Sequence, residues 1–273
     1  MELSRKRLFL FDIDGTLAVG DDWLPGAPAL LDRIDALGGR SLFITNNSTR
    51  SRAAYVERFR TVFGRETDEA QFVTASYLTA LALRERFPGR KVYAQGTCSF
   101  LEELRAFGVD ASDDPACDPA CVVVGYDSEL TYAKLCATAR LLQETELPFF
   151  AANPDLRCPA PFGFIPDCGS ICRMLADTTG REPVYFGKPE AGVVARCLAE
   201  TGFSLDETLV VGDRLYTDIA CGLAAGADTC LFLTGEAQKS DLPGTAFPPD
   251  YVLDGPADLL RILNSAPDDF QDL

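Results

Sequence analysis

The chain has 273 residues, 47% of them hydrophobic and 24% charged, which suffices for a sizeable core in one large domain or two smaller ones. Its 41 acidic and 25 basic residues give a net charge of −16, which disfavours nucleic acid and anionic membranes as partners. The chain contains no histidine, which excludes Ser-His-Asp and Cys-His mechanisms as well as histidine-ligated zinc sites. Proton transfer must therefore fall to carboxylates or to Lys, Tyr or Cys.

The ten cysteines are scattered through apolar segments, which is typical of buried thiols in a reducing compartment. The pairs Cys117/Cys121 and Cys168/Cys172 lack the spacing and the histidines that indicate a metal site. The basic start is followed by an apolar run of only four residues before Asp12, too short for a signal peptide or a membrane span. We therefore expect a cytoplasmic protein.

Strand-like and helix-like segments alternate along the chain, which predicts an α/β fold with a parallel sheet. The first half begins with a buried strand and continues with a helix, a strand and a helix, over residues 8–11, 27–37, 41–45 and 51–63. The C-terminal third repeats this pattern, with strands predicted at 208–211, 229–233 and 251–253 and helices at 216–225 and 257–263. The acidic end, 267–273, is expected to fray.

The residues between these halves have strand signals of their own, at 92–93, 121–124 and 149–152, separated by helical stretches near 97–106 and 132–142. This pattern predicts a complete α/β unit inserted into the first domain. The predicted division is a discontinuous core over 1–79 and 185–273, with an inserted domain over 80–184.

The most informative motif follows the first strand, where Asp12 and Asp14 precede Gly15 and Thr16. Ligands of open α/β sheets bind at the carboxyl ends of strands, so chemistry is expected here. Two acids one residue apart repel each other unless a cation or a proton lies between them.

Other strands also end in polar residues. The second strand ends in Thr45, which is followed by two asparagines, and the strand-like Val184-Tyr-Phe is followed by Gly-Lys188-Pro. That lysine does not belong to a P-loop, since position 182 is Glu where a P-loop requires glycine and Pro189 replaces the Ser or Thr. It is a candidate point charge for phosphate. A third strand ends in Gly-Asp213, with Asp218 five residues later.

In this order, and each at a strand end, these residues resemble the haloacid dehalogenase-like phosphatases over essentially the whole chain. Ile44-Thr-Asn-Asn-Ser, Ala152-Asn-Pro-Asp, Cys168-Gly-Ser-Ile and Gly187-Lys-Pro are similar to signatures of the group that includes 4-nitrophenyl, phosphoglycolate and pyridoxal phosphate phosphatases. The resemblance implies a Rossmann-like parallel sheet core with helices on both faces, plus an inserted α/β cap domain.

The resemblance also implies roles for the residues in the motifs. Asp12 would attack phosphorus and form an aspartyl-phosphate, and Asp14 would protonate the leaving group and later deprotonate water. Mg²⁺ would be held by the Asp12 carboxylate, the Asp14 main-chain carbonyl and Asp213. Asp218 would support the metal or orient the lysine. The phosphate oxygens would be held by Thr45, Asn46, Asn47 and Lys188.

The cap would select the substrate. In the resembled group the loop after the Asn-Pro-Asp segment often carries a histidine, whereas this chain has Arg157 or Cys158 in that place. Arg157 would favour a substrate with a second anionic group, although an ordinary exposed arginine is an equally open interpretation. A homodimer through the cap is also expected.

The resulting hypothesis is a Mg²⁺-dependent phosphatase that hydrolyses phosphate monoesters of small metabolites through an aspartyl-phosphate intermediate. One alternative is a phosphomutase or phosphotransferase with the same nucleophile, which keeps water away from the intermediate. The other is a non-catalytic phosphoacceptor switch, although receiver-like switches are far shorter and carry no such insertion.

Overall fold

The structure of the protein is a computed structural model that describes residues 3–160 and 162–265, so the predicted fraying of 267–273 lies outside the described residues. The chain forms two compact units. The first consists of the chain up to Ile44, Arg60–Phe72 and the chain from Lys188 onward, and the second of Thr45–Phe59 and Val73–Gly187. The domain boundaries predicted from the sequence stay a prediction beside this division.

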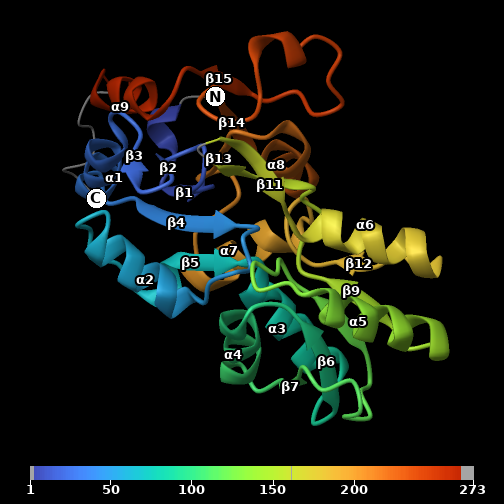
Figure 1. Cartoon of the computed structure of the whole chain (residues 1–273). Coiled ribbons are helices and arrows are strands. Elements are labelled where there is room, and N and C mark those ends of the chain that lie inside the picture. Colours follow the sequence, from blue (N-terminus) through green and yellow to red (C-terminus); the bar gives the residue numbers. More distant parts are fainter. Residues whose placement is uncertain (1–2, 161, 266–273) are drawn as a thin grey trace. The chain divides into compact units, whose positions relative to one another are not determined.

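The first unit is built on a six-stranded sheet with the order β15-β14-β13-β1-β4-β5 (Figure 1). Its strands are β1 (Leu8–Phe11), β4 (Arg40–Thr45), β5 (Phe72–Thr74), β13 (Thr208–Gly212), β14 (Asp228–Phe232) and β15 (Tyr251–Leu253). Strand β1 pairs in parallel with β13 on one side and β4 on the other, and β14 and β15 continue in parallel. All four residues of β1 are buried, because helices cover both faces of the sheet.

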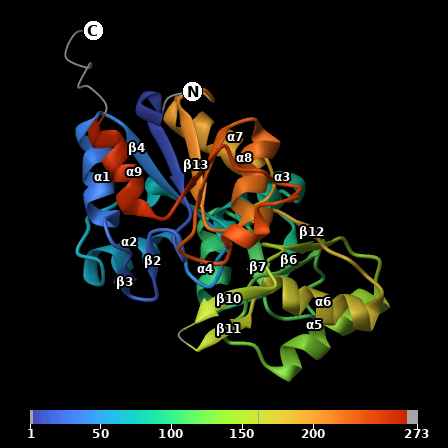
Figure 2. The ribbon, with the colours of Figure 1, turned by 90° about the horizontal axis from the view of Figure 1, so that it is seen from above.

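Helices α1 (Ala27–Ala36) and α9 (Pro256–Ser265) lie side by side on one face of this sheet, with α7 (Gly192–Thr201) and α8 (Ala220–Ala225) on the other (Figure 2). The first unit also contains the short antiparallel pair β2 (Ala18–Val19) and β3 (Asp22–Trp23). Its short helical turns are at Leu3–Arg5, Glu69–Gln71, Leu215–Ile219 and Lys239–Asp241. Helix α2 (Arg52–Thr61) lies mostly in the second unit.

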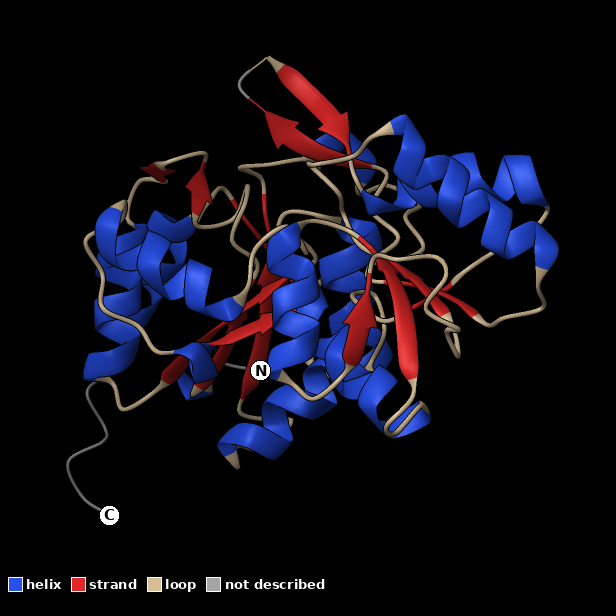
Figure 3. Ribbon diagram, turned by 60° about the horizontal axis from the view of Figure 1, so that its bottom comes forward, coloured by secondary structure: helices blue, strands red, loops and turns tan. Residues whose placement is uncertain are grey.

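The second unit has a parallel sheet of its own, with the order β12-β9-β8-β6-β7. Its strands are β6 (Lys91–Gln95), β7 (Asp110–Ser112), β8 (Val122–Val124), β9 (Phe149–Ala151) and β12 (Val184–Tyr185). Helix α3 (Ala75–Arg86) packs against α4 (Cys98–Ala106), and α5 (Tyr132–Glu144) against α6 (Cys168–Thr179). An antiparallel hairpin of β10 (Arg157–Ala160) and β11 (Gly163–Pro166) precedes α6 and is the pair of red strands at the top of Figure 3.

The predicted fold class, parallel sheets with helices on both faces, is confirmed. Some elements differ from the sequence-based expectation, and the short strands β2, β3, β5, β7, β10 and β11 were not predicted. The helix predicted over 216–225 is a π-helical turn, Leu215–Ile219, followed by α8. Helices α3 and α6 were not predicted. Helix α3 buries Ser76 and Thr79 together with its apolar residues, so it lacks a distinct apolar stripe that would reveal it.

Within the described ranges, no helix combines the length and apolar character needed to cross a bilayer. All ten cysteines are free thiols, and six are buried. This burial agrees with the expectation that most of them are small core residues.

The buried cysteines make stability sensitive to alkaline pH. Burial raises the pKa of the Cys121 thiol to about 12, whereas a thiol in the unfolded chain has a pKa of about 8.5. Between these values the folded state keeps a proton that the unfolded state has lost, so the free energy of unfolding falls as pH rises, by about 1.4 kcal/mol per pH unit for each such thiol. We expect Cys121→Ala to reduce this slope in urea unfolding measured with reductant at several alkaline pH values. Parallel wild-type and variant curves would contradict the prediction.

Candidate catalytic and metal site

The carboxyl ends of β1 and β13 carry two of the predicted acids. The two strands pair in register, Phe11 opposite Val211, and the Asp12 main-chain N–H continues the ladder by donating to the Val211 carbonyl at 2.9 Å. The residues that follow the two strands, Asp12 and Asp213, therefore lie at one edge of the sheet. This edge is also a topological switch point, because the chain leaves β1 toward β4 and later returns on the other side of β1 at β13.

Three carboxylates come together at this edge. Asp12, Asp213 and Asp218 each offer an oxygen, and these oxygens all lie within 4.8 Å of one another. The side chain of Asp12 is 13% exposed, whereas Asp213 and Asp218 are 0% and 1% exposed. Burial raises the pKa of Asp12 well above its usual value and that of Asp213 to about 6, and the neighbouring acids add to both shifts.

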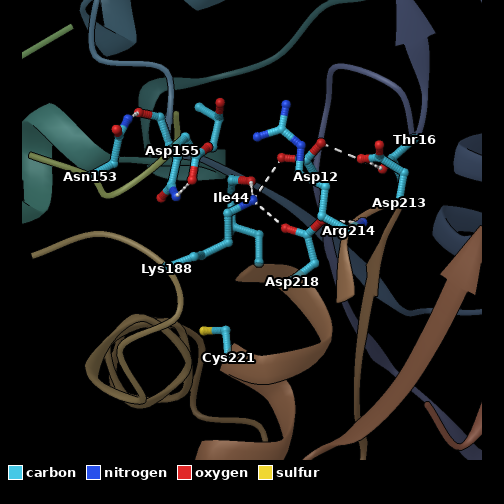
Figure 4. A network of polar contacts seen from close by, with 12 residues as sticks. Asp12, Thr16, Ile44, Asn153, Asp155, Lys188, Asp213, Arg214, Asp218 and Cys221 are labelled. Carbon is cyan, nitrogen blue, oxygen red and sulfur yellow. Dashed lines mark hydrogen bonds and ion pairs between the residues drawn. The ribbon is translucent and has the colours of Figure 1, made fainter. Parts of the chain in front are cut away.

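Lys188 is the cation of this cluster (Figure 4). Its ammonium donates to Asp12 Oδ1 at 2.7 Å, to Asp218 Oδ1 at 2.6 Å and to the Ile44 carbonyl at 3.0 Å, so each of its three hydrogens has an acceptor. The lysine is only 2% exposed. Burial lowers its pKa, but the two carboxylates outweigh this effect and raise the pKa above its ordinary value. Asp218, predicted to support the metal or orient the lysine, thus contacts the lysine directly, and both roles stay predictions.

Hydrogen bonds hold the carboxylates in place. The Thr16 hydroxyl lies 3.4 Å from Asp12 Oδ2 and 3.3 Å from Asp213 Oδ1, and its single hydrogen serves one of them at a time. The Arg214 main-chain N–H donates to Asp218 Oδ2 at 3.1 Å. Thr16 had no predicted role, although its place in the Asp-x-Asp-Gly-Thr motif was a signal that could have suggested one.

The donor set suits a divalent cation. Three ionised carboxylates against one ammonium leave two negative charges in a buried region, where unbalanced charge is costly. Carboxylate oxygens are the hard ligands that Mg²⁺ and Ca²⁺ prefer. The residues present therefore fit such an ion.

Asp14 lies in the turn after β1, is half-buried and forms a bridge with Ala18. Its predicted metal contact uses the main-chain carbonyl and its predicted acid–base role uses the carboxyl group. Both roles stay predictions.

The predicted phosphate-binding asparagines belong to the second unit, where Thr45 and Asn46 are both buried. The Thr45 hydroxyl accepts from the Asn47 main-chain N–H at 3.1 Å. The Asn46 side chain donates from Nδ2 to Asp155 Oδ1 at 3.0 Å, and its main-chain carbonyl accepts from Asn153 Nδ2. Asp155, at 3% exposure, thus fixes the Asn46 side chain, a contact that the sequence did not suggest.

Arg157 and Cys158, the predicted substrate-loop residues, lie on β10 of the hairpin. Arg157 is exposed, and its guanidinium stacks on the Phe164 ring of β11, 4.3 Å from the ring centre. A contact of either residue with a substrate stays a prediction.

Comparison with known proteins gives matches at both ends of the chain. A sequence model of haloacid dehalogenase-like hydrolases matches residues 9–110, and one of HAD-hydrolase-like proteins matches residues 185–259. The first range contains Asp12, and the second contains Lys188 and Asp213. An acid sugar phosphatase of Staphylococcus aureus (strain MRSA252) is 32% identical over 249 residues, 91% of this chain and 95% of that protein.

Solved structures of phosphatases are also similar to this chain over most of its length. The 4-nitrophenylphosphatase of Thermotoga maritima is 33% identical, with a TM-score of 0.89 over 96% of this chain and 98% of that chain. The glycerol phosphate phosphatase of Mycobacterium tuberculosis in complex with magnesium is 28% identical, with a TM-score of 0.86 over 96% of this chain and 78% of that chain. A complex of the same protein with calcium is also similar to this chain.

The role of Lys188 as counter-ion can be tested by its removal. Lys188→Met leaves buried carboxylates without their cation, so we expect the free energy of unfolding in chelator to fall by about 3–5 kcal/mol. Adding Asp218→Asn should recover part of this loss. The control is Lys239→Met, whose side chain is 75% exposed and whose loss should change stability by less than about 0.5 kcal/mol. Equal urea unfolding curves for wild type and Lys188→Met would contradict the assignment.

Proposed function

This chain belongs to the haloacid dehalogenase-like hydrolases, and we propose that it is a Mg²⁺-dependent phosphatase that cleaves phosphate monoesters of small metabolites through an aspartyl-phosphate. The buried cluster of Asp12, Asp213 and Asp218 around Lys188, two positive charges short of neutrality, carries the proposal. The phosphatase names of the similar proteins support the reaction class, and the magnesium complex of one of them supports the choice of ion.

The cation would be held by the carboxylates of Asp12 and Asp213 and by the Asp14 main-chain carbonyl. When bound, it supplies positive charge that lets a phosphate dianion approach a carboxylate. Two like unit charges 4 Å apart repel by about 4 kcal/mol at an effective dielectric constant of 20, so this neutralisation is required.

Asp12 is the proposed nucleophile. One of its carboxylate oxygens forms a bond to phosphorus while the bond from phosphorus to the ester oxygen breaks, and Asp14 protonates the departing oxygen. In the second step Asp14 takes a proton from water, the water oxygen bonds to phosphorus, and Asp12 is released as a carboxylate. The sequence has no histidine, and the family resemblance implies that Asp14 performs this proton transfer.

Lys188 favours the ionised, nucleophilic form of the Asp12 carboxylate. An ammonium 2.7 Å from Asp12 Oδ1 favours the ionised form of that carboxylate against the effect of burial. The salt bridge to Asp218 at 2.6 Å holds the ammonium in position. When a phosphate group enters, Lys188 can exchange one of its acceptors for a phosphate oxygen.

The substrate is proposed to be a small phosphorylated metabolite, with sugar phosphates as the first class to examine because one similar protein is an acid sugar phosphatase. Thr45, Asn46 and Asn47 would hold the phosphate oxygens. The predicted cap, residues 80–184, would select the organic part of the substrate, with Arg157 and Cys158 as candidate contacts.

Phosphate release from 4-nitrophenyl phosphate tests the reaction class. We expect release with Mg²⁺, loss of activity after EDTA treatment, and recovery when excess Mg²⁺ is added, because the buried carboxylates need the cation. A panel of sugar phosphates then examines the substrate class. Activity that is unchanged in EDTA would overturn the metal requirement. No release from any ester, with and without metal, would overturn the phosphatase assignment.

Asp12→Asn tests the covalent mechanism. An amide cannot act as the nucleophile, so we expect turnover to fall by about a thousandfold or more, while the far-ultraviolet circular dichroism stays native. Acid quenching of wild type with ³²P-labelled substrate should trap a hydroxylamine-sensitive phosphoprotein that the variant lacks. Asp32→Asn is the matched control, since that side chain is 72% exposed. Wild-type turnover in Asp12→Asn would exclude this nucleophile.

A further inference from the structure

We propose that the turn after β14, Thr234 to Glu236, is a positioning element that holds Asp213 in the orientation needed to bind the cation. The inference rests on the proposed function, because it concerns a residue assigned to the metal. It assigns a role to residues outside the sequence motifs.

The turn holds Asp213 through main-chain groups. The Glu236 N–H donates to Asp213 Oδ2 at 2.7 Å, and the Ala237 N–H donates to the Asp213 carbonyl at 3.0 Å. With Oδ2 held in this way and Oδ1 lying 3.3 Å from the Thr16 hydroxyl, the rotation of the carboxylate is fixed. Asp213 is fully buried, so water does not replace these contacts.

Two glycines enclose the same carboxylate. A Cβ placed on Gly235 would lie 2.0 Å from Asp213 Oδ2, and one on Gly15 would lie 2.8 Å from that oxygen. Gly15 also has a φ of 95°, a backbone conformation that residues with a side chain rarely adopt. At Gly235, glycine is required only because a Cβ has no room. Any side chain at position 235 must therefore displace the Asp213 carboxylate.

Thr234 fastens the turn to the first motif. Its hydroxyl donates to the Gly15 carbonyl at 2.6 Å, which ties the turn after β14 to the turn after β1. Gly15 lies between Asp14 and Thr16, so this bond links the turn that contacts Asp213 to the segment that carries the first motif.

Glu236 fastens the other end of the turn. Its carboxylate pairs with Arg214 Nε at 3.2 Å, and the Tyr216 hydroxyl lies 3.2 Å from both of its oxygens. Arg214 follows Asp213 directly. The side chain of Glu236 is thus anchored to the segment after Asp213, while its N–H contacts the Asp213 carboxylate.

These contacts resemble those of outer-shell partners of metal ligands, whose loss lowers metal affinity about 10- to 100-fold. Thr234→Val removes the hydroxyl at nearly constant volume, Thr234→Ser keeps it, and Gly235→Ala introduces the excluded Cβ. Gly192→Ala is the matched control, because a Cβ there meets nothing within 4 Å.

The experiment measures the Mg²⁺ concentration at the midpoint of the thermal shift of each protein, together with the metal-free melting temperature. We expect Thr234→Val and Gly235→Ala to raise the Mg²⁺ midpoint about 10- to 100-fold, with Thr234→Ser and Gly192→Ala close to wild type. Asp213→Asn serves as the reference for a lost ligand. In the activity assay, Thr234→Val and Gly235→Ala should raise the Mg²⁺ concentration needed for half-maximal activity by a larger factor than they lower kcat at saturating Mg²⁺.

The outcomes separate this inference from the proposed function. If wild type shows a Mg²⁺-dependent shift but Thr234→Val lowers only the metal-free melting temperature, the turn is merely structural and the inference is overturned. If wild type neither responds to Mg²⁺ nor releases phosphate, the proposed function fails first, and the inference fails with it.

Discussion

The ion pairs of Lys188 with Asp12 and Asp218 are the interaction on which the site depends. A single buried ammonium holds two carboxylates at 2.6 to 2.7 Å, and a third, Asp213, lies beside them. Because the lysine neutralises only one of three acids, the cluster either takes up protons or binds a cation. The raised pKa values of Asp12 and Asp213 correspond to proton uptake, and a bound divalent ion would instead stabilise all three carboxylates in their ionised form. The net charge of −16 makes this local positive charge more necessary for an anionic substrate.

The parallel sheet makes this concentration of charge possible. It brings the ends of β1 and β13 together, so that acids distant in sequence share one edge. Glycines then let the backbone approach closely: a Cβ on Gly212 would lie 2.2 Å from the Asp218 side chain, and Gly15 and Gly235 enclose Asp213. The main-chain N–H groups of Arg214 and Glu236 donate hydrogen bonds to the carboxylates of Asp218 and Asp213, respectively. These neutral donors orient the carboxylates without cancelling the charge that would bind the cation.

The sequence predicted the parts of this arrangement that depend on local signals. Strand β1, the motif after it, the fold class and the family follow from short-range patterns, and the predicted acids Asp12, Asp213 and Asp218 do lie together. The hydroxyl contacts of Thr16 and Thr234 join residues 197 and 219 positions apart, and the contact from Glu236 uses a main-chain amide that every residue but proline possesses. No local pattern reports such contacts. Helix α3 escaped prediction for a different reason, because it buries polar and apolar residues together.

The proposed chemistry and the proposed substrate selection lie on different parts of the chain. The four proposed site residues Asp12, Lys188, Asp213 and Asp218 all belong to the first unit. They are largely buried and linked by ion pairs and hydrogen bonds, which leaves little freedom for substitution. Arg157 and Cys158 belong to the second unit and lie on a hairpin. The exposed Arg157 can change at little cost in stability, whereas Cys158 is half-buried against the core of that unit. Asn46 is the exception within that unit, since the buried Asp155 and Asn153 both hold it. A side chain held in this way suits the proposed phosphate contact, which every substrate would share, and the hairpin is where the proposed discrimination among substrates would vary.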